Sequence, residues 1–249
     1  MKKFFRFLAV AGAMAFSANI AFAQDEMSAA DLLSGNPEMP LNQALKQKFI
    51  EGGPEFMSLI IICLILGMAL AIERILYLTF SKINTKKLVE KVEAALNEGG
   101  IEKAKDVCRE TRGPVASIFY QGLLRYDQGL DVVEKTIVSY GSVQQSELES
   151  GLSWIGLFIA IAPSLGFLGT VIGMINAFDA IQAAGDISPN VVAGGMKVAL
   201  ITTVGGLIVA MILQVFYNYI LAKIESITID MEDSSISLID VLTKYSQKK

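Results

Sequence analysis

Thr170 and Thr203 are the residues of this sequence whose type and setting best suit ion chemistry. They lie in two stretches, residues 151–178 and 198–222, that contain no Asp, Glu, Lys or Arg. A threonine in such a stretch usually bonds its hydroxyl to the carbonyl one turn earlier. Among glycines and alanines it can instead offer the hydroxyl to water, an ion or another helix in a narrow space. We therefore take these two threonines as a candidate ion pathway.

Each threonine belongs to a stripe of small residues, with steps of four, three and four along the chain. Small side chains let helices in a membrane approach closely, because packing drives their association there. Spacing alone favours packing, either within a hairpin or against a neighbouring copy, and lining of a pore is the alternative. The packing or pore-lining residues are Gly166, Gly169, Gly173 and Ala177 in the first stretch and Ala199, Gly206 and Ala210 in the second.

The remaining polar inventory excludes several classes of function. The chain has no histidine, and its net charge is −4 without a basic face. We therefore predict no metal, no cofactor, no nucleic-acid partner and no enzymatic activity, since a nucleophile–base pair is also missing. Cys63 and Cys108 lie in different settings, so we expect two buried thiols and not a disulfide.

Three further residues have structural interpretations. Pro163 interrupts the hydrogen-bond ladder of its helix, and we predict a packing kink there, with freed carbonyls facing a pore as the alternative. Glu73 and Arg74 follow the first long apolar run. We expect this pair to reach toward the inner membrane interface, with an ion pair between helices as the second interpretation.

The elements that carry these residues are predicted to be membrane helices. Of the 249 residues 53% are hydrophobic and 18% charged, and the apolar residues are concentrated in three runs. A helix needs about 20 apolar residues to cross a bilayer. We assign transmembrane helices to residues 55–80, 151–178 and 197–222. Residues 1–23 have the basic start, short apolar run and Ala21-Phe22-Ala23 of a signal peptide. We expect cleavage before Gln24, with an uncleaved amphipathic anchor as the alternative.

Charge predicts the orientation of these helices. Residues 81–150 carry ten Lys and Arg beside eleven Asp and Glu, whereas residues 179–196 carry no Lys or Arg. Cytoplasmic loops retain basic residues. We therefore predict periplasmic segments at 24–54 and 179–196, a cytoplasmic helical domain at 81–150 and a cytoplasmic tail at 223–249.

The predicted fold class is all-α. In the cytoplasmic domain we expect a helix opened by Asn84 and breaks at Gly99-Gly100, Gly113-Pro114 and residues 127–129. From Leu130 a helical pattern runs into the second span, and the tail continues the third. The second and third spans are therefore expected to extend into the cytoplasm as long helices.

The sequences APSLGFLGTVIGMINAF (162–178) and ALITTVGGLIVAMILQVFYNY (199–219) closely resemble the ExbB–TolQ–MotA family, and most of all ExbB. The resemblance implies a homo-pentamer in the inner membrane of a Gram-negative bacterium. It also implies a dimer of a single-span, ExbD-like partner in the central pore, with protons passing an aspartate of the partner. A TonB-like protein would carry the work to outer-membrane transport. Thr170 and Thr203 match the family's polar pore residues.

One position departs from the family pattern. Many members carry a glutamate five residues before the threonine of the third span, and this chain has Val198 there. The chain therefore cannot relay protons on carboxylates of its own second and third spans, which leaves a titratable partner or sodium coupling. A TolQ-like role in envelope integrity and a structural scaffold without ion conduction are the alternative functions.

Overall fold

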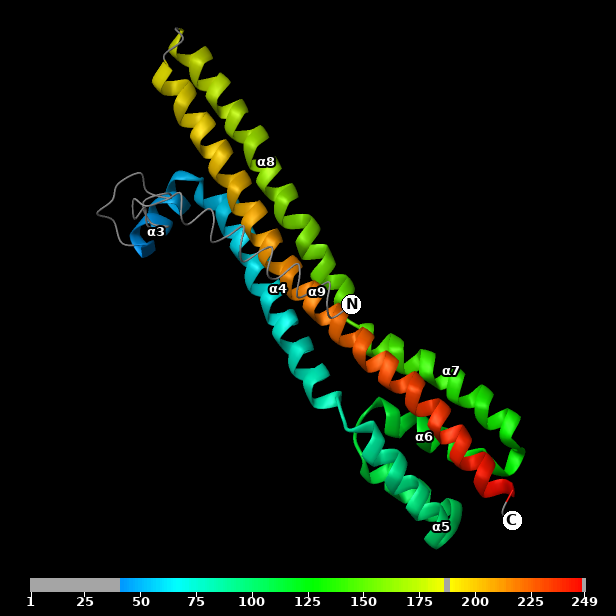
Figure 1. The fold of residues 1–249 in the computed structure, drawn as a ribbon. Coiled ribbons are helices and arrows are strands. Elements are labelled where there is room, and N and C mark those ends of the chain that lie inside the picture. Colours follow the sequence, from blue (N-terminus) through cyan, green and yellow to red (C-terminus); the bar gives the residue numbers. More distant parts are fainter. Residues whose placement is uncertain (1–40, 186–188, 248–249) are drawn as a thin grey trace, which may run out of the picture. The chain divides into compact units, whose positions relative to one another are not determined.

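The computed structural model describes residues 41–185 and 189–247, and Figure 1 shows their arrangement. The predicted signal peptide and most of the predicted segment 24–54 lie outside these residues. All regular elements in the described part of the chain are helical, as predicted. They are α3 (Leu41–Glu51), α4 (Pro54–Ser81), α5 (Thr85–Glu110), α6 (Pro114–Leu124), the short 3-10 helix η1 (Tyr126–Gln128), α7 (Leu130–Glu149), α8 (Leu152–Ala184) and α9 (Pro189–Gln247).

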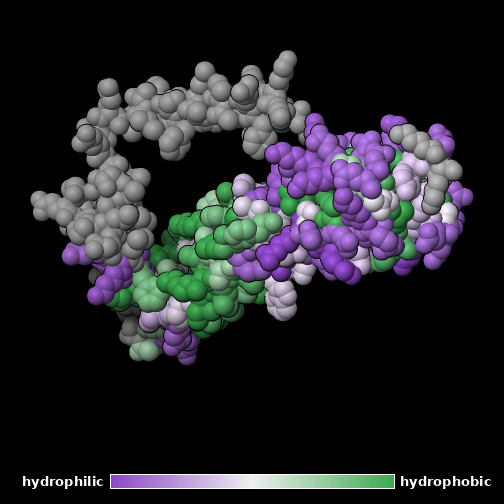
Figure 2. Space-filling view, turned by 90° about the horizontal axis from the view of Figure 1, so that it is seen from below, coloured by the Kyte–Doolittle hydropathy of each residue, from purple (hydrophilic) through white to green (hydrophobic). Residues whose placement is uncertain are grey.

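Three of these helices, α4, α8 and α9, are long and apolar enough to cross a membrane, which agrees with the predicted number of candidate spans. Many of their large apolar side chains point outward, among them Ile65 of α4, Phe167 of α8 and Leu200 of α9. Figure 2 shows a broad hydrophobic zone on one face. Hydrophilic residues gather over the part that contains α5, α6 and α7. An exposed apolar surface of this extent is typical of a protein that contacts lipid or another protein chain there.

The chain divides into two compact units, and α4, α8 and α9 contribute to both. Among the described residues, the first unit comprises 41–58, 167–185 and 189–204, and the second comprises 59–166 and 205–247. The first contains both candidate threonines. The second contains α5, α6 and α7, which gather around the C-terminal part of α9 in Figure 1.

The core of the second unit is built around α6. Ile118, Phe119 and Leu123 are almost completely buried, and Leu238 and Leu242 of α9 belong to the same cluster. Burial of each such side chain stabilises the fold by roughly 1.5–3 kcal/mol. Cys108 lies in this core as well, and both it and Cys63 are buried free thiols, as expected.

The predicted helix ends in this domain follow from local chemistry. The side chain of Asn84 accepts a hydrogen bond from the amide of Lys87 and caps α5. Gly100 breaks the helical path inside α5 with φ +71°, and Gly113 precedes Pro114 at the start of α6 with φ +119°. A positive φ is costly for residues with a side chain, so these glycines fix the breaks.

The structure departs from the sequence prediction between α7 and α8. We expected one helix from Leu130 into the second span, but α7 ends at Glu149 and α8 begins at Leu152. Gly151 adopts φ +84°, and a Cβ atom built there would lie 2.9 Å from Nε of Arg74. The other predicted extension is confirmed, because α9 runs for 59 residues from Pro189 to Gln247 without interruption.

Candidate functional site

Gly169 of α8 and Thr202 of α9 form a close contact in the first unit. A Cβ atom built on Gly169 would lie 2.6 Å from Oγ1 and 2.8 Å from Cβ of Thr202. Only glycine therefore permits this contact. Thr202 is completely buried, and its hydroxyl donates to the carbonyls of Ala199 at 2.9 Å and Val198 at 3.2 Å.

Sequence reasoning missed Thr202, although a signal for it existed. Ala199, Thr202 and Gly206 follow at steps of three and four, which is also the spacing of one helix face. The pair Thr202-Thr203 offers two threonines to α8, and only the register of the hairpin decides which one faces it.

The small-residue stripes are used to pack the hairpin on itself. In the first unit, a Cβ atom on Gly173 would lie 3.2 Å from the carbonyl oxygen of Gly195 and 3.3 Å from Cβ of Ala199, and Gly195 faces Ala177. Within the second unit, Gly206 lies against the carbonyl of Ala162 and the Cα atom of Gly166, and Ala210 is buried. The backbones of α8 and α9 are thus in direct contact along both stripes.

Thr170 and Thr203 lie at one level of this hairpin. Each follows a residue of the Gly169–Thr202 contact, so the two lie within about 3 Å of each other along the helix axes. One residue turns a side chain by about 100° around its helix. Because α8 and α9 run antiparallel here, the two rotations carry both side chains to the same side of the hairpin.

Both hydroxyls make local bonds. The hydroxyl of Thr170 donates to the carbonyl of Phe167 at 2.5 Å, and that of Thr203 donates to the carbonyl of Ala199 at 3.2 Å. Both side chains are half-buried, unlike that of Thr202. The Thr170 hydroxyl, which donates to its own helix, still has oxygen lone pairs that can accept a hydrogen bond. Their role in an ion pathway remains a prediction.

The opposite side of α9 packs against the corner between α3 and α4. A Cβ atom on Gly52 of this corner would lie 2.8 Å from Cγ2 of Ile201, and one on Gly53 would lie 3.6 Å from Cγ1 of Val198. Ile201 precedes Thr203 by two residues, which places the two about 200° apart around the helix. The corner therefore supports α9 from behind the threonine side.

An ion pair joins this corner to α9. The Oε1 atom of Glu51 accepts a hydrogen bond from Nζ of Lys197 at 2.8 Å and another from Nε2 of Gln47 at 3.0 Å. Its Oε2 atom accepts one from Nζ of Lys48 at 3.2 Å. These donors, led by Lys197, lower the pKa of Glu51 to about 2 against the opposing effect of burial. Glu51 therefore stays ionised at neutral pH.

The remaining predicted residues lie in the second unit. Oε2 of Glu73 and Nε of Arg74 form an ion pair with each other at 3.0 Å, and the guanidinium lies over the ring of Tyr77. Pro163 lies inside α8, next to the Ala162 carbonyl that faces Gly206. Lacking an N–H, it leaves the helical partner carbonyl of Ile159 without its usual donor. A kink at Pro163 stays a prediction.

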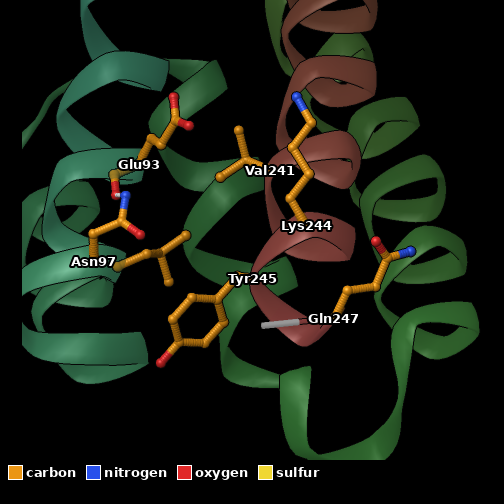
Figure 3. Close-up of a pocket in the computed structure, with 7 residues that line it drawn as sticks. Glu93, Asn97, Val241, Lys244, Tyr245 and Gln247 are labelled. Carbon is orange, nitrogen blue, oxygen red and sulfur yellow. Dashed lines mark hydrogen bonds between the residues drawn. The ribbon is translucent and has the colours of Figure 1, made fainter. Parts of the chain in front are cut away.

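Two other kinds of site were considered in the described residues. No group of three or more His, Cys, Asp or Glu side chains in residues 41–185 and 189–247 is placed to hold a metal ion. A hollow of about 350 Å³ lies between α5 and α9, and Figure 3 shows Glu93, Asn97, Lys244 and Tyr245 around it. These are ordinary groups of a solvated helical surface, so the hairpin remains the candidate site.

Comparison with known proteins points to a single family. The model of the MotA/TolQ/ExbB proton channel family matches residues 110–233, a range that includes Thr170, Thr202 and Thr203.

Three curated proteins illustrate the likeness. A putative biopolymer transport protein ExbB homolog of Methanothermobacter thermautotrophicus is 34% identical over 182 residues, which is 73% of this chain and 63% of that protein. The biopolymer transport protein exbB1 of Vibrio cholerae is 39% identical over 90 residues, 33% of this chain and 40% of that protein. A putative ExbB-like protein of Synechocystis is 30% identical over 162 residues, 62% of this chain and 74% of that protein. The chain thus spans less than two thirds of the first two relatives.

Proposed function

Since this chain belongs to the MotA/TolQ/ExbB proton channel family, we propose that it is an ExbB-like subunit of an ion-driven motor in the inner membrane. In this proposal five copies surround a dimer of a single-span, ExbD-like partner. The proton motive force acts on the pair, and a TonB-like protein passes the work to transport across the outer membrane. The N-terminus is periplasmic and the C-terminus cytoplasmic.

The proposal rests on one observation. Thr170 and Thr203 lie at the same height along the α8–α9 hairpin and on the same side of it. The same side of the hairpin presents exposed apolar residues next to the threonines, including Leu200, which is 63% exposed, and Phe167, which is 68% exposed. The other side of α9 is occupied by the α3–α4 corner. A partner helix would therefore dock on the threonine side, where it meets apolar surface with two hydroxyls in its middle.

Charge divides the chemistry between the two proteins. Residues 151–178 and 198–222 contain no Asp, Glu, Lys, Arg or His, so in this proposal the group that takes up and releases the proton comes from the partner. A threonine hydroxyl suits both states of such a carboxyl group. It donates a hydrogen bond to the ionised carboxylate and accepts one from the protonated acid.

A threonine hydroxyl loses little free energy when it exchanges its backbone carbonyl for the partner's carboxylate. To donate to a carboxylate, the Thr170 or Thr203 hydroxyl must give up its bond to the carbonyl of Phe167 or Ala199. A local hydrogen bond of this kind contributes about 0.5–1.5 kcal/mol, and a bond to a charged group is stronger. The hydroxyls would thus stabilise the ionised partner and help to set its pKa.

The test compares three isosteric substitutions in the complex reconstituted with its single-span partner. Thr170→Val and Thr203→Val should leave assembly intact and lower ion-driven transport severely, because each removes a hydroxyl from the partner side. Thr202→Val is the matched control, since its hydroxyl faces α8 and not the partner.

Normal transport in the Thr170→Val/Thr203→Val double variant would contradict the proposal and leave both residues with a packing role. A loss in Thr202→Val equal to that in Thr203→Val would also count against it. Imposing a sodium gradient without a proton gradient, and the reverse, identifies the coupling ion.

A further inference from the structure

We propose that the α3–α4 corner is a clip that holds the outer end of α9 in register, with Glu51 and Lys197 as its lock. In this proposal both are positioning residues. They fix the height and rotation of Thr203 through the backbone of α9 and do not touch the ion. The inference rests on the proposed function for its transport readout. Its structural part is testable separately.

The clip has a steric part and a polar part on the same segment of α9. The steric part is the backbone of Gly52 against Ile201, supported by Gly53 beside Val198. Gly53 adopts φ +80°, which turns the chain from α3 into α4 directly at this contact. A side chain at Gly52 would collide with Ile201, so the close approach depends on glycine.

The polar part is built to hold one lysine. Glu51 is 18% exposed, and both of its oxygens are occupied by donors, two from α3 and one from α9. Lys197 is the donor from α9, and its side chain is 52% exposed. Lys48 and Gln47 thus fix the carboxylate in place before it meets Lys197. A preorganised, charge-assisted bond fixes geometry more firmly than a mobile surface pair.

Position explains why the clip would affect the threonines. Lys197 lies six residues before Thr203, about 9 Å along the helix axis, and Ile201 lies directly behind Thr203. Contacts between small residues, such as those of Gly173 and Gly195, offer few interlocking side chains, so in this proposal the clip adds a second restraint on sliding and rotation of α9. A slip of α9 by one residue would displace Thr203 by about 1.5 Å and turn it by about 100°.

The clip also accounts for the valine at position 198. Val198 precedes Thr203 by five residues, which places it about 140° away around α9, on the side of the corner. It packs beside Gly53 there. A carboxylate at this position would stand near Glu51 and compete with it for Lys197, so the valine is consistent with a lock made by Glu51 alone.

The experiment uses the full-length complex in lipid nanodiscs. Glu51→Gln and Lys197→Met each remove one half of the lock, Lys197→Arg preserves it, and Glu55→Gln is the matched control. Glu55 is an exposed carboxylate at the start of α4, so it makes the same charge change four residues away. Amide hydrogen exchange over residues 192–200 reports the clip, and ion-driven transport reports the function.

We expect at least ten-fold faster exchange over residues 192–200 and several-fold lower transport in Glu51→Gln and in Lys197→Met, with assembly retained. The double variant should be no worse than either single variant, because both remove the same interaction. Lys197→Arg and Glu55→Gln should behave as the unaltered complex.

Unchanged exchange in both single variants would refute the lock. Faster exchange with normal transport would refute the positioning role while leaving the lock in place. These outcomes differ from failure of the proposed function, in which the threonine variants transport normally but exchange still responds to Glu51→Gln. If one of the two variants fails to assemble, the other still tests the lock, because Glu51 and Lys197 are each replaced separately.

Discussion

Replacing Gly169 by alanine tests whether the contact between α8 and α9 sets the threonine level. The new Cβ atom would lie 2.6 Å from Oγ1, 2.8 Å from Cβ and 3.1 Å from Cγ2 of Thr202. Carbon atoms in van der Waals contact are separated by about 3.5–4.0 Å. The two side chains must therefore move apart by roughly 0.7 Å or more.

Thr202 has little freedom to move alone. It is completely buried, and its hydroxyl is bonded to the carbonyls of Ala199 and Val198. Relief must therefore come from separation of the helices. Overpacking of this kind costs about 1–3 kcal/mol. Alanine regains up to about 1 kcal/mol over glycine in helix propensity. We expect a net loss of about 1–2 kcal/mol in the free energy of unfolding.

Gly156→Ala is the matched control in the same helix. A Cβ atom built on Gly156 has no heavy atom within 4 Å, so this variant should be neutral or slightly stabilised. Reversible unfolding of the reconstituted protein in mixed micelles gives the free energies, and transport is measured on the same samples. Gly169→Ala should lower transport because it displaces Thr170 and Thr203 with their helices.

A double-mutant cycle separates this contact from other effects. Thr202→Gly removes all three atoms that the new methyl group meets, so in combination it should recover about 1–2 kcal/mol of the loss from Gly169→Ala. If Gly169→Ala unfolds and transports like Gly156→Ala, or if the cycle shows no coupling, the close contact does not exist in the membrane. The argument for a fixed threonine level would then fail.

Three further predictions follow from single residues. Gly173→Leu should prevent assembly with the partner, as judged by co-purification, because its side chain collides with Gly195 and Ala199; wild-type co-purification would contradict this. Cys108 should resist alkylation at pH 8 until the protein unfolds, because burial raises the pKa of its thiol to about 12. Glu51 has a lowered pKa, so the stability it contributes is present above pH 4.5 and is lost as the pH falls toward 2. Spin-label distances between α3 and α9 should accordingly stay constant from pH 5 to 9 and lengthen only in strong acid.

Local chemistry explains why most of the fold was predictable. Asn84 is a good N-cap, and Gly113 with Pro114 ends one helix and starts the next by backbone preference alone. The break at Gly151 is different, because one glycine inside a helical pattern is usually tolerated. There the guanidinium of Arg74 lies where a side chain would stand. That contact comes from α4 and cannot be read from the sequence around Gly151.

The candidate site shows the same division between local and tertiary information. Thr170 and Thr203 could be found because each lies on a stripe of small residues at helical spacing. Thr202 could not be separated from Thr203 by spacing, because their roles depend on which one meets Gly169. The pair of Glu51 and Lys197 joins residues far apart in the sequence and leaves no local pattern at all.

The missing carboxylate at position 198 is best understood from the two faces of α9. Val198 lies toward the α3–α4 corner, whereas Thr203 lies toward the side that the corner leaves uncovered. A titratable side chain at 198 would therefore belong to the support of the helix and not to the threonine level. Because Val198 packs against the α3–α4 corner, the polar side chains of this hairpin at the height of the threonines are hydroxyls. Hydroxyls can hydrogen-bond a carboxyl group in either protonation state but do not carry the proton themselves. The proton, or the ion in its place, must then be held by the partner helix, and the hairpin supplies a close-packed, uncharged surface against which that helix works.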